Sequence, residues 1–163
     1  MQARQLIPFT GSLIALVACA GVHEHGSSTL SIADVPDNVR HTLDARFPSA
    51  SVSSVAREHE HGTTVYDFEL RQSGRKYEAD VAENGTLLEV EKEVGIHDVP
   101  ESVLHAAQAK YHGAIVRDVM EVDVVNGTEE RPDHYEVVLV VGSETHEVNV
   151  SLDGKSVDEE DED

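Results

Sequence analysis

The 163-residue chain carries 32 acidic against 12 basic residues, which gives a formal net charge of −20 at pH 7. This balance excludes nucleic acid as a natural partner, because phosphate binding requires concentrated Lys and Arg. An anionic membrane surface would also repel the chain. Cations and basic proteins remain as the partners that the charge favours.

Residues 1–18 are expected to be a secretory signal peptide. One basic residue, Arg4, precedes the short apolar run SLIALVA. A membrane-spanning helix needs roughly 20 apolar residues, so this run fits the apolar region of a signal peptide better than a span. The segment therefore predicts export.

The run leads into Leu-Val-Ala-Cys, which resembles the lipobox of bacterial lipoproteins, where the cysteine is lipid-modified and becomes the first mature residue. Cys19 is the only cysteine, so it can form no internal disulfide. We predict lipid attachment at Cys19. Because Ala20 rather than Asp follows, the resemblance implies a periplasmic protein anchored to the outer membrane. The alternative is an ordinary signal peptide that contains a cysteine.

The mature chain divides into a tether and two similar units. Residues 19–31 are rich in Gly, Ser and His and predict a flexible tether. The stretch DVPDNVRHTLDARFP begins at Asp34, and DVPESVLHAAQAKYH begins 64 positions later at Asp98. This repetition predicts one unit over residues 32–95 and a second over 96–158, followed by an acidic tail over 159–163.

Each unit is expected to open with a helix. Pro36 and Pro100 suit the first helical turn, where the missing N–H costs nothing. Apolar residues then recur at the spacing i, i+4, i+8, which predicts one stripe facing a core. The stripes are Val39, Leu43 and Phe47 in the first unit and Val103, Ala107 and Tyr111 in the second.

Four strands follow the first helix: SVSSVAREHE, VYDFEL, KYEADV and LLEVEKEV. Alternation of apolar and polar residues predicts which side chains face the helix. Those are Val52, Val55, Tyr66, Phe68, Leu70, Tyr77, Ala79, Val81, Leu88 and Val90. Between the third and fourth strands, Glu83 to Gly85 (ENG) predicts a type I′ hairpin turn.

The second unit shows the same order. Its helix-facing positions are Val116, Val119, Tyr135, Val137, Leu139, His146, Val148 and Val150. Five additional residues in NGTEERPD predict a longer hairpin loop. One helix cannot cover four strands, so we predict an α+β fold in which two tandem α-β-β-β-β units form an antiparallel sheet with the helices packed on one face.

The order and spacing of these motifs resemble those of a known protein family. A helix opened by DVP..V, then RFP.A.V..V, YDFEL and G.KYEADV..NG.L.E, is similar to the PepSY-like family, whose fold resembles that of the beta-lactamase inhibitory protein. The similarity spans about residues 32–160. It implies an exported, non-enzymatic binding module, and PepSY relatives in peptidase propeptides point to peptidases as partners. The second unit departs from the pattern at VGSETHEVNV, so the resemblance implies a binding surface mainly on the first unit.

Strand alternation also predicts an acidic face on the side of the sheet away from the helices. Opposed like charges destabilise neighbouring strands, so bound cations, a basic partner or nearby Lys and Arg residues should offset them. The alternative is an ordinary solvated face. The six carboxylates of this candidate binding face are Asp67, Glu69, Glu78, Asp80, Glu89 and Glu91, and the second unit has a thinner set in Glu136, Glu147 and Asp158.

The histidines suggest a weaker candidate site. HEHG occurs at His23 to Gly26 and again at His59 to Gly62. His59 and His61, on one face of a strand, would supply two ligands for zinc or copper, whereas a zinc site requires three or four. Exposed polar residues at a hairpin end are the alternative, and no calcium-binding loop of the EF-hand pattern is present.

No sequence motif indicates catalysis. The chain lacks both the G-x-S-x-G nucleophile elbow and the G-x-x-x-x-G-K-[ST] phosphate loop. We therefore expect no enzymatic activity and no cofactor, other than a divalent cation in the second hypothesis. The first hypothesis is a cell-envelope binding protein that restrains another envelope protein, such as a peptidase, through the acidic face. The second is periplasmic binding or buffering of calcium, zinc or copper.

Overall fold

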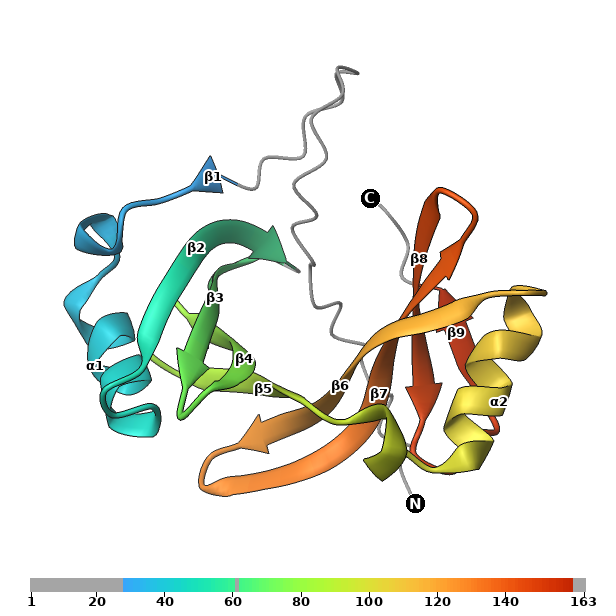
Figure 1. Cartoon of the computed structure of the whole chain (residues 1–163). Helices are drawn as coiled ribbons and strands as arrows, with labels where there is room; N and C mark the ends of the chain where they lie inside the picture. Colours follow the sequence, from blue (N-terminus) through green and yellow to red (C-terminus); the bar gives the residue numbers. More distant parts are fainter. Residues whose placement is uncertain (1–27, 61, 160–163) are drawn as a thin grey trace.

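A computed structural model describes residues 28–60 and 62–159 (Figure 1). Nine strands form one sheet in sequence order, and every neighbouring pair is antiparallel. The predicted α+β fold is thereby confirmed. The strands are β1 (Ser28–Thr29), β2 (Ser51–Glu60), β3 (Thr63–Gln72), β4 (Arg75–Ala82), β5 (Leu87–Glu93), β6 (Ile115–Asn126), β7 (Glu129–Val141), β8 (Glu144–Ser151) and β9 (Val157–Glu159).

Two helices precede the two sets of strands. These are α1 (Asp37–Arg46) and α2 (Glu101–Lys110), each preceded by a 3-10 turn, η1 (Ile32–Asp34) and η2 (Ile96–Asp98). Pro36 and Pro100 occupy the N-cap positions, one residue before the first helical turn. Within the helices, the buried residues are the predicted Val39 and Leu43 of α1 and Val103 and Ala107 of α2.

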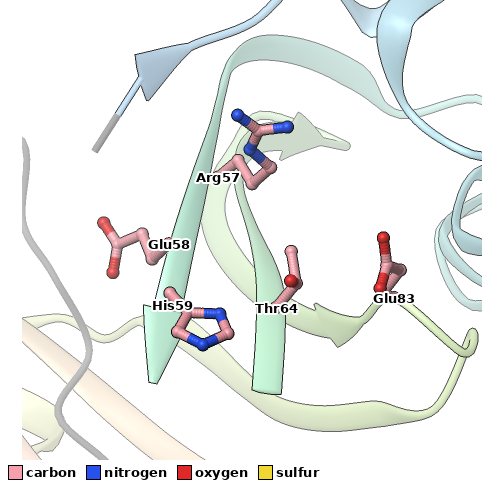
Figure 2. Close-up of a pocket in the computed structure, with 5 residues that line it drawn as sticks. All are labelled: Arg57, Glu58, His59, Thr64 and Glu83. Atoms are coloured by element: carbon pink, nitrogen blue, oxygen red, sulfur yellow. The ribbon is translucent and has the colours of Figure 1, made fainter. Parts of the chain in front are cut away.

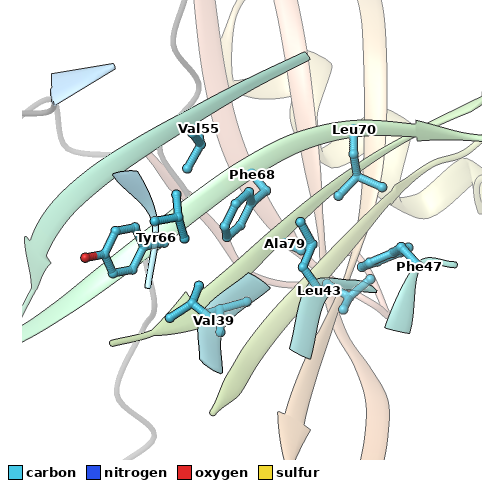
Figure 3. Close-up of a cluster of buried hydrophobic side chains, with 11 residues drawn as sticks. Val39, Leu43, Phe47, Val55, Tyr66, Phe68, Leu70 and Ala79 are labelled. Carbon is cyan, nitrogen blue, oxygen red and sulfur yellow. The ribbon is translucent and has the colours of Figure 1, made fainter. Parts of the chain in front are cut away.

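Each helix packs on its own apolar cluster. Val39 and Leu43 of α1 lie against the side chains of β3 and β4, as Figure 3 shows, and Phe68 and Leu70 of β3 are fully buried there. The second cluster joins Val103 and Ala107 to buried residues of β6, β7 and β8. In Figure 1 the two helices lie at opposite ends of the sheet.

Both helices cover the same face of the sheet. Val90, in the first cluster, stands opposite Asp123, and Lys92 stands opposite Glu121. Directly opposed residues share a face, and residues two apart on a strand share it as well. Glu121 therefore lies on the same side as Val119 of the second cluster, and the prediction of helices on one face is confirmed.

The turn after β4 differs from the prediction. The N–H of Gly85 donates to the carbonyl of Ala82 at 2.7 Å, and Gly85 has φ +86°, whereas Asn84 is not in the positive-φ region. A type I′ turn requires positive φ at both central residues, so that prediction is wrong. The turn instead ends in a left-handed glycine, the three-residue hairpin geometry. Asn38 and Thr42 of α1 donate side-chain hydrogen bonds to the carbonyls of Glu83 and Gly85, which holds the turn against the helix.

The segment NGTEERPD is not a long loop. β6 continues to Asn126, β7 begins at Glu129, and only Gly127 and Thr128 connect them. Gly127 has φ +66°, and glycine at the first central position suits a type II′ turn. The five additional residues therefore lengthen the hairpin, because Val124 and Val125 continue the strand pairing.

Three smaller predictions also change. The register shifts between Asp80 and Val81, so Leu87 rather than Leu88 packs against the first cluster. Ser28–Thr29, expected in the tether, is a strand because it pairs with β2. Glu159, expected in the acidic tail, pairs with Val148. The signal peptide, Cys19, the rest of the tether and residues 160–163 lie outside the described residues.

No helix within residues 28–60 and 62–159 is long and apolar enough to cross a membrane.

Candidate functional site: an acidic sheet face

The six predicted carboxylates form two rows across β3, β4 and β5. In one row Asp67 stands opposite Asp80, which stands opposite Glu89. In the other, Glu69 stands opposite Glu78, which stands opposite Glu91. Because directly opposed side chains share a face, all six lie on the side away from α1. The structure thus brings together the residues that alternation singled out.

These carboxylates are not solvated. Asp67, Glu78, Asp80, Glu89 and Glu91 are buried, between 2% and 8% exposed, and Glu69 is half-buried. Acidic side chains are rarely buried to this extent without compensating partners. The ordinary solvated face, which sequence alone left open, is therefore not what the structure shows.

Burial changes the charge state of the face. Burial, with repulsion from Asp80 and Glu78 next in importance, raises the pKa of Asp67 to about 9. Burial and then the neighbouring Glu136 raise the pKa of Glu91 well above its usual range. With a pKa of about 9, Asp67 keeps its proton near neutral pH. The face therefore carries less negative charge than its composition suggests.

One lysine offsets part of the remaining charge. The Nζ atom of Lys76 lies 2.5 Å from Oε1 of Glu78. Burial still leaves the pKa of Glu78 raised, although Lys76 opposes the shift. Burial alone would lower the pKa of Lys76, but attraction to Glu78 outweighs it and the pKa is raised. At the edge of the face, the hydroxyl of Ser54 donates to Oε2 of Glu69 at 2.8 Å.

The second half has a different surface on this side. Glu136 is buried and acts on Glu91 through repulsion and a side-chain hydrogen bond. Glu147 is half-buried, and Asp158 is exposed on the short strand β9. Most of the other buried positions of β6 and β7 on this side are apolar, namely Met120, Val122 and Val138. All three predicted acids of the second half thus lie on this side, but none of them stands directly opposite another acid.

Sequence reasoning missed a partly buried ion-pair cluster on the helix side. Nζ of Lys92 lies 2.6 Å from Oε1 of Glu121 and 3.0 Å from Oδ2 of Asp123. The hydroxyl of Tyr135 donates to Glu121 at 3.3 Å. The alternation of Val119, Glu121 and Asp123 indicated that these three side chains share one face. It did not predict the ion pairs, because the pairing of β5 with β6 cannot be inferred from a single strand.

The histidine site is incomplete in the described residues. His59 is exposed and lines an open pocket with Arg57, Glu58, Thr64 and Glu83 (Figure 2). Figure 2 shows Glu58 pointing away from the side of β2 that carries His59. His61, its predicted companion ligand, lies outside the described residues. Within the described part of the chain, no group of three or more His, Cys, Asp or Glu side chains is arranged to hold a metal ion.

Comparison with known proteins identifies relatives only among solved structures. No protein-family model matches the sequence, and no curated protein matches it. A candidate periplasmic protein of Bacteroides eggerthii is 16% identical with a TM-score of 0.55, over 77% of this chain and 88% of that one. A DUF2874 family protein of Bacteroides uniformis is 18% identical with a TM-score of 0.53, over 76% and 88% of the two chains.

A BLIP-like protein of Bacteroides fragilis is 22% identical over 77% of this chain and 84% of that one, with a TM-score of 0.48. At these identities, the structures with TM-scores above 0.5 establish a shared fold, and membership of the PepSY-like family stays a prediction. The chain thus shares its α+β fold with bacterial proteins that include members of the DUF2874 family.

Proposed function

We propose that this chain is a non-catalytic binding protein of the cell envelope that holds another envelope protein on its acidic face. The observation that carries the proposal is the pair of carboxylate rows across β3, β4 and β5. Opposed like charges cost stability, and a protein retains such a cost where a function requires it. Of the six carboxylates, Glu69 is the half-buried one, so a basic surface on a partner would reach the face at this edge.

The envelope location rests on separate observations. The N-terminal segment resembles a lipoprotein signal, with Cys19 as the lipid attachment site. One structural neighbour is described as a candidate periplasmic protein. The resemblance to the PepSY-like family directs the search for a partner to peptidases. Anchoring to the outer membrane is part of the same proposal.

The proposal is tested by crosslinking at the face. A photo-crosslinking amino acid replaces Glu69, which is half-buried at the edge of the acidic rows, in the full chain expressed in its native host. The matched control places the same group at Glu129, an exposed residue of the β6–β7 hairpin. We expect one envelope protein to be captured from the first position and not from the second.

The captured protein then allows a binding measurement. Glu69→Lys should weaken its binding at least tenfold and reduce the salt dependence, whereas Glu129→Lys should change the affinity less than twofold. Equal capture from both positions, or unchanged affinity in Glu69→Lys, would remove the acidic face as the binding surface. Binding of calcium, zinc or copper, the second hypothesis, stays a prediction that metal-dependent thermal unfolding can check.

A further inference from the structure

The two halves of the sheet have separate cores. The first cluster is formed by α1 with β2 to β5 and the second by α2 with β6 to β8, and they share no buried residue. The halves are joined where β5 pairs with β6, from Glu89 opposite Val124 to Glu93 opposite Met120. We call this junction the seam. Val125 of β6 also packs against the first cluster, so the strand pair is the main connection between the halves but not the whole of it. Two packed bodies connected mainly in this way are an arrangement from which hinge motions arise.

On the helix side, the seam is held by attractive charges. Lys92 of β5 bridges Glu121 and Asp123 of β6. Arg46, the last residue of α1, donates two hydrogen bonds to Glu130 of β7, at 2.7 and 3.1 Å. Such bidentate pairs are the stronger kind of ion pair. Both contacts join the first half to the second and resist separation on this side.

On the acidic side, the contact across the seam is of the opposite kind. Glu91 of β5 stands opposite Val122 and Glu136 of β7 stands opposite Met120, so the two buried side chains lie on the same face on either side of β6. There they form a side-chain hydrogen bond. Two carboxyl groups can form such a bond only while one of them carries a proton. When that proton leaves, two negative charges face each other in a buried site, where repulsion is stronger than in water.

We propose that the seam is a proton-sensitive hinge, which opens on the acidic side when the Glu91–Glu136 pair loses its proton and pivots about the Lys92 bridge on the helix side. The inference goes beyond partner binding and holds whether or not the face has a partner. In this mechanism, a change in the pH of the envelope would change the curvature of the acidic face.

The surroundings of Glu91 favour retention of the proton. The neighbouring carboxylates are Glu78 of β4, opposite Glu91, and Asp67 of β3, and both raise the pKa of Glu91 after burial and Glu136.

Other charged or titratable groups also lie on this side of the seam. They are Lys76, Glu69, Asp80, Glu89, Glu93, Arg131, His134 and Glu147. Burial lowers the pKa of His134, and Arg131, opposite Val124, is the cation of this set that β7 contributes. Lys76 is already paired with Glu78.

A distance measurement between the halves tests the hinge. In the full chain carrying Cys19→Ser, spin labels are attached at Arg71→Cys in β3 and Thr145→Cys in β8, both exposed. Electron–electron double resonance then gives the distance between labels at about pH 5 and about pH 9. We expect the distance to change by several ångströms as the pH rises, and the change to reverse on acidification.

A matched variant tests whether Glu91 causes the change in distance. Glu91→Gln keeps a hydrogen-bond donor at the same place without a titratable proton, so its distance should stay at the acidic value throughout. Glu144→Gln, at an exposed position of β8, should behave like the parent. A parent distance that does not change with pH overturns the proposal, as does a Glu91→Gln chain that retains the full change. Neither result would bear on crosslinking at Glu69, so this test and that of the proposed function fail separately.

Discussion

The two halves of the molecule use the same order of elements but differ on one face. On the helix side they correspond closely: Val39 and Leu43 of α1 have counterparts in Val103 and Ala107 of α2, and both sets are buried. On the other side, β3 to β5 carry six carboxylates, whereas most of the buried positions of β6 and β7 there are apolar and the one buried acid is Glu136.

The difference between the two sides of the sheet shows which positions are constrained by packing against a helix and which are not. A helix must bury its apolar stripe, so the helix side of both halves is constrained by packing. The opposite side packs against neither helix, and its buried residues differ between the halves. The carboxylates of β3 to β5 occupy positions where opposed like charges cost stability, and this cost is the ground for the proposed binding role.

Removal of a core side chain should have the largest effect and should show whether the halves unfold together. Phe68→Ala should cost about 3–5 kcal/mol and Leu139→Ala about 2–5 kcal/mol, because both side chains are fully buried and leave cavities. Urea unfolding measures both. If the halves form one cooperative unit, each variant shifts the whole transition. Ile115→Ala, at a site 70% exposed, should change stability by less than about 0.5 kcal/mol. A cost below about 1 kcal/mol in Phe68→Ala would contradict the core assignment.

The two turns that contact the helices offer a smaller, matched comparison. A Cβ atom on Gly154 would lie 2.6 Å from the backbone of Ser102 in α2, whereas a Cβ on Gly85 would meet Asn38 of α1 at 3.2 Å. Both glycines have positive φ, which costs other residues roughly 1–2 kcal/mol.

Gly154→Ala should therefore destabilise by more than about 2 kcal/mol, and Gly85→Ala by roughly 1–2 kcal/mol. Thermal unfolding provides the comparison. Gly113→Ala isolates the backbone cost, because no atom lies within 4 Å of its added Cβ. Equal losses at Gly154 and Gly113 would show that the turn of the second half moves freely away from α2.

The acidic face should show a smaller effect on stability than the core and an unusual pH dependence. The pKa of Asp67 is about 9 in the folded chain, against an ordinary value of 3.8. The folded state therefore binds more protons than the unfolded state between these values, and stability falls as pH rises through this window. One fully linked proton contributes about 1.4 kcal/mol per pH unit.

Asp67→Asn should remove this contribution. We expect it to raise the free energy of unfolding by roughly 1–3 kcal/mol at pH 8 and to flatten the profile between pH 4 and pH 9. Asp158→Asn, at an exposed site in the second half, should leave the profile unchanged. If the parent chain became more stable as pH rose from 5 to 9, the buried, protonated face would be disproved. Chemical denaturation at several pH values measures the free energy of unfolding of the parent and both variants.

Much of the fold could be predicted from local patterns. Apolar spacing in α1 and α2 and alternation in β3, β4 and β7 predicted which side chains face the core, since period and face are local properties of a helix or strand. Predictions failed where pairing between strands decides the outcome. The register shift after Asp80 placed Leu87 in the core instead of Leu88, and pairing of Val124 and Val125 turned an expected loop into strand.

The sequence by itself determined which residues share the acidic face, because alternate residues of a strand point to the same side whatever the strand pairs with. Only the tertiary structure decided what that face is chemically. Register aligned the carboxylates into rows, burial raised the pKa of Asp67 and Glu91, and the pairing of β5 with β6 brought Lys92 to Asp123. The charge state of a side chain depends on its neighbours and on its exposure to solvent in three dimensions. Neither can be predicted from the spacing of residues along one strand.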